Sequence, residues 1–275
     1  MRRLLNKTAI VTGASSGLGR AIALRYAAEG AKLVCADLAP SARRSGSGAG
    51  NDADAGKDMD THELIRRRGG EAQFVEADVG EKEGVERLVG AAVERWGRVD
   101  VMVNNAGVSF EAKTPAVLHL TDDKVWDDTM CINARSVFLG CKYAIAQMLK
   151  QEPHESGDRG WIVNISSIMG LIAGPQNPSY CASKGAVSSL TRQAALDYAE
   201  HRIHCNAICP GYIQTAIFRE TTQNLTPWDV LVKRHPFGGP GHAEDVAKIA
   251  VTLASDDASW MTGTNIPVDG GFTAR

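Results

Sequence analysis

The amino end of the chain places a short β-prone run directly before a turn rich in glycine. The run is Thr8-Ala-Ile-Val-Thr12, the turn is Gly13-Ala-Ser-Ser-Gly17-Leu-Gly19, and a helical apolar pattern follows. A strand, a glycine turn and a helix in this order present backbone N–H groups to a phosphate. Gly13 permits the tight turn, Gly17 lets the backbone approach a pyrophosphate, and Gly19 allows close packing of helix on strand. The sequence therefore predicts an α/β fold that begins with a phosphate-binding turn.

The second β-prone run ends in a carboxylate and indicates which nucleotide the turn binds. This run is Lys32-Leu-Val-Cys-Ala-Asp37, and Asp37 lies about twenty residues after the turn, where an acid accepts hydrogen bonds from an adenosine ribose. A carboxylate there also repels a 2′-phosphate, which favours NAD over NADP. Ser16, next to Gly17, is not basic, but Arg43 and Arg44 lie close enough in sequence to reach a 2′-phosphate instead.

The same alternation of strand and helix continues along the chain. Strands are expected at roughly 7–12, 31–37, 72–77, 99–103, 160–165, 203–208 and 264–268, with helical patterns between them. This order predicts one doubly wound domain over residues 1–275, with a seven-stranded parallel sheet and helices on both faces. Residues 39–57, rich in Gly, Ser, Ala and Asp, are expected to be a flexible insertion, and residues 151–159 a polar surface loop.

Three groups that can act on one oxygen atom follow the fifth predicted strand. Ser167 ends the strand region, Tyr180 comes thirteen residues later, and Lys184 lies one helical turn beyond it. A free phenol has a pKa of about 10, and we expect the Lys184 ammonium to lower the pKa of Tyr180 by stabilising the phenolate. A tyrosine and a lysine at this spacing are usually a solvated pair. Together with the phosphate-binding turn, they indicate a site that interconverts a carbonyl and an alcohol.

Six motifs in a fixed order resemble those of the short-chain dehydrogenase/reductase family, and the resemblance covers nearly the whole chain. The motifs are the Thr12–Gly19 turn, Asp78-Val79, Asn104-Asn-Ala-Gly107, Asn133 in a long helix, the Ser167, Tyr180 and Lys184 set, and Pro210-Gly-Tyr-Ile-Gln-Thr215. The resemblance implies a Rossmann fold and an NAD(P)-dependent oxidoreductase acting on CH–OH groups. The cofactor carries the hydride, Ser167 bonds the substrate oxygen, and Tyr180 transfers the proton.

The resemblance also implies a role for each motif residue. Asn133 would hold a water that links Lys184 to solvent, and the helix over residues 124–150 would be bent or locally open there. The implied catalytic residues are Asn133, Ser167, Tyr180 and Lys184. The implied cofactor-binding residues are Gly13, Ser15, Ser16, Gly17, Leu18, Gly19, Asp37, Asp78, Val79, Asn105, Ala106, Gly107, Tyr180, Lys184, Pro210, Ile213 and Thr215.

The substrate is expected beneath residues 212–240, which the resemblance and their apolar residues suggest form a lid hinged near Gly238-Gly239. Candidate pocket residues are Ser109, Met169, Leu171, Ile172, Gln176, Tyr212, Phe218 and Trp228. This mostly apolar set has no fixed cationic clamp and favours an uncharged secondary alcohol or ketone of moderate size. A 3-oxoacyl thioester reductase is the alternative, with Arg219, Lys233 and Arg234 facing a carrier protein. A catalytically silent NAD sensor is an alternative of another class, but such proteins are expected to lose the tyrosine or lysine.

Composition excludes several other kinds of protein. The chain has 30 Lys and Arg against 32 Asp and Glu, a net charge of −2, which gives no reason to expect nucleic acid as a partner. No apolar run reaches the roughly 18 residues of a membrane span, and the first residues lack a secretory signal's apolar core. Six cysteines without a CxxC pair suggest reduced thiols in the cytoplasm. No metal is expected, because His201, His204 and Cys205 lie where helix passes to strand and should diverge.

The family resemblance implies a homotetramer, assembled partly through the helices that carry Asn133 and Tyr180. The apolar positions of these helices exceed what one sheet face obviously covers, and they are Val137, Phe138, Tyr143, Ala144, Met148, Ala186, Leu190 and Ala194. The alternative is that all of them face the sheet.

Overall fold

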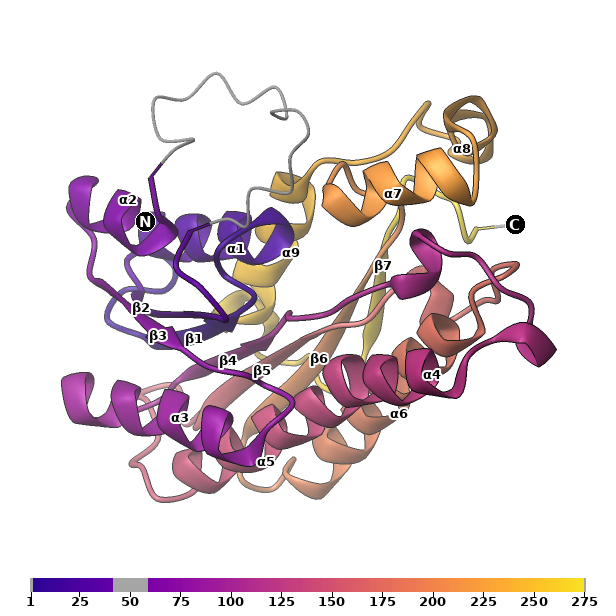
Figure 1. Ribbon diagram of the computed structural model, residues 1–275. Coiled ribbons are helices and arrows are strands. Elements are labelled where there is room, and N and C mark those ends of the chain that lie inside the picture. Colours follow the sequence, from indigo (N-terminus) through magenta and orange to yellow (C-terminus); the bar gives the residue numbers. More distant parts are fainter. Residues whose placement is uncertain (1, 42–58, 275) are drawn as a thin grey trace.

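The computed structural model describes residues 2–41 and 59–274, which form a seven-stranded parallel sheet in the order β3-β2-β1-β4-β5-β6-β7 (Figure 1). The strands are β1 (Thr8–Thr12), β2 (Lys32–Asp37), β3 (Ala72–Glu76), β4 (Val101–Asn104), β5 (Gly160–Ile165), β6 (Ile203–Pro210) and β7 (Asn265–Val268). Every strand end lies within two residues of its predicted position. The predicted fold class is confirmed.

Helices cover both faces of this sheet, as Figure 1 shows. One face carries α1 (Gly17–Ala28), α2 (Thr61–Arg67) and α9 (Ala243–Leu253), and the other carries α3 (Lys82–Trp96), α5 (Ser136–Met148) and α6 (Pro178–Asp197). Tyr26 of α1 is fully buried against α9 and donates a hydrogen bond to the Ala250 carbonyl at 2.8 Å. Burial of apolar side chains on both faces is the main force that holds the layers together.

The strand register brings the carboxyl ends of neighbouring strands to one edge of the sheet. Thr12 pairs with Ala36, Asn104 with Asn164, and Ile165 with Ile208. The residues that follow these strands therefore lie side by side, although they are far apart in sequence. Strand order reverses between β1 and β4, and ligands of open α/β sheets bind at such a point.

The long helix predicted over residues 124–150 is locally open in the middle. It consists of α4 (Asp123–Met130), a π-helical segment over Cys131–Arg135, and α5. Asn133 lies in the π-helical segment, so the opening falls where the family resemblance placed it. Single π turns of this kind often occur at functional sites.

Four of the eight apolar positions considered for subunit contacts serve the core of the chain itself. Val137, Ala144, Met148 and Ala194 are buried on the sheet side, so the expectation that they are surplus surface is wrong. Phe138 is 48% exposed and remains available to a partner. Helical phase decides the difference, because Val137 and Phe138 are adjacent in sequence but point in different directions.

Three other segments, for which an insertion, a surface loop and a lid were predicted, can be compared with the structure. Of the expected insertion at 39–57, residues 42–57 lie outside the described residues. The loop at 151–159 is not simply a surface turn, because the fully buried Asp158 accepts a hydrogen bond from His204 at 2.8 Å. The segment 212–240 contains α7 (Ala216–Asn224) and α8 (Trp228–Arg234), which lie together at one end of the molecule in Figure 1.

Two further findings concern the described residues as a whole. None of their helices combines the length and apolar character that crossing a membrane requires. All six cysteines lie among them, and each is a free thiol.

Candidate active site

A cavity of about 1930 Å³ runs along the carboxyl edge of the sheet and collects most of the predicted site residues. The predicted cofactor residues that line it are Gly13, Ser15, Ser16, Gly17, Leu18, Asp37, Asp78, Val79, Asn105, Ala106, Gly107, Tyr180, Lys184, Pro210, Ile213 and Thr215. Gly19 is not part of the lining, because it is buried beneath the turn. The volume exceeds the roughly 300–1,000 Å³ typical of a single small ligand and leaves room for a dinucleotide together with a substrate.

The glycine turn is closely packed and depends on glycine at two positions. A Cβ atom at Gly19 would lie 2.1 Å from the Gly13 carbonyl oxygen, and Gly13 itself has a φ of +66°. Ser16 is the N-cap of α1, but its side chain makes no capping hydrogen bond. The first N–H groups of α1 therefore lack the side-chain acceptor that usually caps them, and an anion can supply it.

The end of the cavity that is predicted to hold the adenosine contains a fixed carboxylate. Asp37 Oδ2 accepts a hydrogen bond from the Ser15 N–H at 3.1 Å, and Oδ1 accepts one from the Leu38 N–H at 2.8 Å. These bonds hold the carboxylate at the end of β2, where an adenosine ribose is expected. Arg43 and Arg44, the alternative contacts to this end of the nucleotide, lie outside the described residues.

Ser167, Tyr180 and Lys184 all line the same cavity, near the ends of β5 and β6. Lys184 Nζ donates a hydrogen bond to the Ile165 carbonyl at 2.8 Å and lies 5.6 Å from the centre of the Tyr180 ring. Gly107 lies beside this group, and a Cβ atom there would be 3.2 Å from Asn133 Oδ1, a tighter contact than most Cβ atoms make. The tertiary structure thus brings an alcohol, a phenol and an ammonium group together.

The environment changes the pKa values of this set in a way that the spacing did not predict. Burial raises the pKa of Tyr180 to about 12, and a hydrogen bond from Ser167 opposes this only in part. Burial also lowers the pKa of Lys184 to about 8. The expectation that Lys184 lowers the pKa of Tyr180 is therefore wrong for the protein without ligands. Burial disfavours the charged form of each group, and the Lys184 ammonium hydrogen bonds to the Ile165 carbonyl.

Asn133 is fully buried and braces the site from behind the cavity wall. Its Oδ1 accepts a hydrogen bond from the Val108 N–H at 2.8 Å, and its Nδ2 donates to the Val108 carbonyl at 2.9 Å and to Ser183 Oγ at 3.1 Å. These bonds join the loop after β4 to α6. Asn133 therefore fixes the position of the helix that carries Tyr180 and Lys184.

The predicted substrate residues divide into two groups. Ser109, Met169, Tyr212 and Phe218 line the cavity, whereas Leu171, Ile172, Gln176 and Trp228 do not. Trp228 instead packs edge-on against Phe218, with ring centres 5.6 Å apart. Further residues outside the predicted site set also line the cavity, among them Phe110, Asn177, Thr221 and Leu225. The position of Asn177 directly before Pro178, at the start of a predicted helix, was a signal that could have identified it.

Of the three basic residues considered as contacts for a carrier protein, only one lines the cavity. Arg219 lines the cavity, whereas Lys233 and Arg234 of α8 do not.

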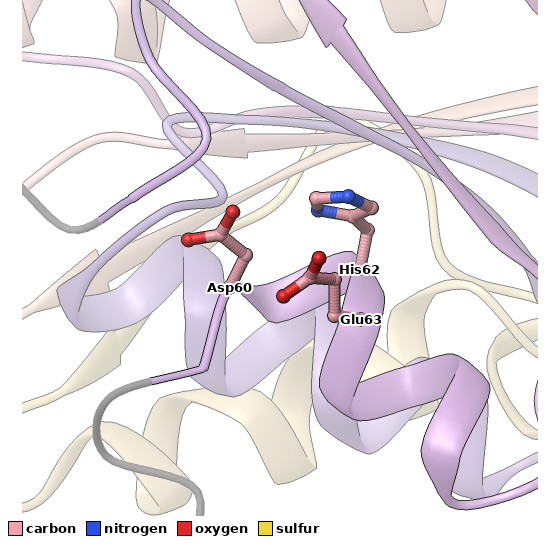
Figure 2. Close-up of side chains that lie close together, drawn as sticks. All are labelled: Asp60, His62 and Glu63. Atoms are coloured by element: carbon pink, nitrogen blue, oxygen red, sulfur yellow. The ribbon is translucent and has the colours of Figure 1, made fainter.

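One group of potential metal ligands occurs among the described residues, at the start of α2 (Figure 2). Asp60, His62 and Glu63 place one ligand atom each within 4.8 Å of one another. None of the three is fully buried, and exposed acidic groups often gather without an ion. We assign no metal to this group. His204, which sequence analysis had considered, hydrogen bonds to Asp158.

Comparison with known proteins shows what the chain is similar to over its length. The family model described as "Enoyl-(Acyl carrier protein) reductase" matches residues 13–273. The 2-(R)-hydroxypropyl-CoM dehydrogenase of Xanthobacter autotrophicus is 36% identical over 98% of this chain and 100% of its own length. The meso-2,3-butanediol dehydrogenase of Serratia marcescens is 35% identical over 99% of this chain and 96% of its own. A short-chain type dehydrogenase/reductase from Mycobacterium marinum has a crystal structure that superposes with a TM-score of 0.86 at 28% identity, covering 100% of this chain and 98% of its own.

The chain belongs to the short-chain dehydrogenase/reductase family, and the fold, the order of the motifs and the relatives agree on this assignment. It is an NAD(P)-dependent oxidoreductase that acts on CH–OH groups, interconverting secondary alcohols and ketones.

Proposed function

We propose that the protein interconverts an uncharged secondary alcohol of moderate size and the corresponding ketone, with NAD preferred over NADP. The observation that carries this proposal is that Ser167, Tyr180 and Lys184 share one cavity with an uncapped helix N-terminus and a fixed Asp37 carboxylate. The substrate end is lined by Met169, Tyr212 and Phe218, which suit an uncharged compound. We further propose that residues 212–240 act as a lid over this end of the cavity.

The residues of the chain divide the work of binding and proton transfer. The α1 N-terminus and Asp37 would hold the nucleotide, which supplies or accepts the hydride when bound. The Ser167 hydroxyl hydrogen bonds the substrate oxygen, and Tyr180 donates a proton to that oxygen in reduction and takes it back in oxidation. Lys184 lies close enough to stabilise the phenolate as it forms. We propose that Asn133 keeps a water-filled path from Lys184 to solvent.

This proposal is tested by following NADH absorbance with purified protein and a panel of secondary alcohols, diketones, sugars and 3-oxoacyl thioesters. Turnover of uncharged alcohols or ketones supports it. Faster turnover of 3-oxoacyl thioesters would favour the carrier-protein alternative, for which Arg219 is the one of the three basic residues considered that lines the cavity. NADH binding without turnover of any compound would favour the sensor alternative.

Cofactor choice depends on Asp37, and kcat/KM for NADH is expected to exceed that for NADPH. Asp37→Ala should narrow this ratio, because it removes both the ribose hydrogen bonds and the repulsion of a 2′-phosphate. Steady-state kinetics with both cofactors measure the effect. Asp60→Ala is a suitable control, because Asp60 also lines the adenosine end of the cavity but does not follow β2. A wild type that prefers NADPH would contradict the assignment.

We also propose that the protein is a cytoplasmic homotetramer. The exposed Phe138 on α5 supports contacts between the helices of neighbouring subunits. Light scattering at micromolar concentration is expected to give about four times the 29.4 kDa mass of one chain. Phe138→Asp should reduce this mass, because a charge at an apolar contact opposes association. A wild-type mass near that of one chain would rule out the tetramer.

A further inference from the structure

The helix that carries Tyr180 is capped by a residue from a distant part of the chain. Glu111 lies in a short 3₁₀ turn over Phe110–Ala112, after β4, and is 1% exposed. Its Oε1 accepts a hydrogen bond from the Ser179 N–H at 2.9 Å, and its Oε2 accepts one from the Tyr180 N–H at 3.0 Å. These N–H groups are the second and third of α6, which an N-cap side chain normally satisfies.

Because Glu111 accepts hydrogen bonds from these N–H groups, the side chain at the N-cap position of α6 is not needed to cap the helix. This residue is Asn177, one of the types most favoured for capping, yet its side chain makes no capping hydrogen bond. Its Oδ1 is buried and has no hydrogen-bond partner among the described residues, and the whole residue is 7% exposed. Buried amide oxygens are rarely left unpaired, because water no longer compensates them. Asn177 also lines the cavity.

The position of Asn177 relative to Tyr180 indicates which part of a ligand it meets. Asn177 begins the turn of α6 that contains Tyr180, three residues later, so both belong to the same end of the helix. The neighbouring lining is largely apolar, with Met169, Tyr212 and Phe218. A substrate held through its reacting oxygen at Tyr180 would therefore share the cavity with the polar side chain of Asn177.

We propose that Asn177 is a specificity-determining residue that hydrogen bonds a second oxygen of the substrate, on the carbon next to the reacting one. The substrate class is then a vicinal diol or an α-hydroxy ketone. An amide offers both a donor and an acceptor, and rotation about its last side-chain bond exchanges them. A neighbouring hydroxyl, which also donates and accepts, can pair with either group. This inference rests on the proposed function and specifies the substrate of the same site.

The test compares matched pairs of alcohols that differ by one hydroxyl: butane-2,3-diol with butan-2-ol, and cyclohexane-1,2-diol with cyclohexanol. The wild type is expected to prefer the diol of each pair in kcat/KM. Asn177→Ala should lower kcat/KM for the diols about 10-fold or more, as expected for loss of one buried hydrogen bond. It should leave the plain alcohols within about threefold, because they make no such bond. Asn177→Ser keeps an N-cap residue but shortens the side chain, so the same loss is expected even if the alanine variant folds poorly.

Two other variants separate substrate recognition from displacement of the helix. Glu111→Gln replaces one acceptor oxygen by an NH₂ group and should lower kcat for the diols and the plain alcohols alike, leaving their ratio unchanged. Ser189→Ala, at an exposed position on the same helix, should change neither kcat nor the diol-to-alcohol ratio. A diol-to-alcohol ratio that is the same in the wild type, Asn177→Ala and Asn177→Ser would overturn the inference.

The outcomes also distinguish this inference from the proposed function. A wild type that oxidises plain secondary alcohols but no vicinal diol overturns the role of Asn177 and leaves the proposed function standing. A wild type that oxidises no alcohol and reduces no ketone in the larger panel overturns both.

Discussion

Replacing Tyr180 with phenylalanine is expected to lower turnover at least about 100-fold, the loss typical of removing a general acid. The ring remains, so packing in the cavity wall changes little, but no group is left to give a proton to the substrate oxygen. Burial raises the pKa of Tyr180 to about 12 in the protein without ligands, so the phenol is protonated at neutral pH. It can therefore act as the donor in the reductive direction.

Single-turnover kinetics and NADH titration separate the two effects of this substitution. The rate should fall, while the dissociation constant for NADH stays within about threefold of wild type, because the nucleotide is held largely by other residues. Tyr198→Phe, at the carboxyl end of α6 and outside the cavity lining, should leave both unchanged. A Tyr180→Phe variant that reduces substrate at a near wild-type rate would show that another group supplies the proton.

Gly19→Ala is expected to have the second largest effect, through the phosphate-binding turn. The new Cβ atom would lie 2.1 Å from the Gly13 carbonyl oxygen and 2.5 Å from Asn105 Nδ2. Neither atom can move freely, since one belongs to the backbone and the other donates a hydrogen bond to the Thr12 carbonyl at 2.8 Å. Overpacking of this kind lowers the free energy of unfolding by about 1–3 kcal/mol or more. NADH binding should weaken as well, because the turn that faces the phosphates must shift.

Gly90→Ala provides the matched control for this prediction. Gly90 lies within α3, and a Cβ atom there meets nothing within 4 Å. The substitution should raise the free energy of unfolding by about 0.5–1 kcal/mol, since alanine restricts the unfolded chain and favours the helix. Urea unfolding measures both variants. If Gly19→Ala is as stable as Gly90→Ala and binds NADH normally, the close packing at Gly19 does not shape the site.

The strands and the glycine turn could be predicted because their signals are local. A parallel sheet buried on both faces needs short apolar runs, and these runs identified every strand to within two residues. The turn needs a glycine where φ is positive, as at Gly13, and where no Cβ fits, as at Gly19. Substrate residues were less predictable, because the side chains of one loop diverge. Met169 lines the cavity, for example, whereas Leu171 in the same loop does not.

Sequence by itself determined the order of the strands and helices, the phosphate-binding turn and the identities of Ser167, Tyr180 and Lys184. Only the tertiary structure decided the pKa values of these groups and the hydrogen bonds that hold the helix carrying them. The pKa of Tyr180 is raised and not lowered, because its burial depends on chain segments distant in sequence. The cap of α6 comes from Glu111 and not from the adjacent Asn177, because the fold places a carboxylate from residue 111 beside residues 179 and 180. Spacing along a chain fixes which groups are present, but solvent exclusion and hydrogen-bond partners depend on contacts between distant segments.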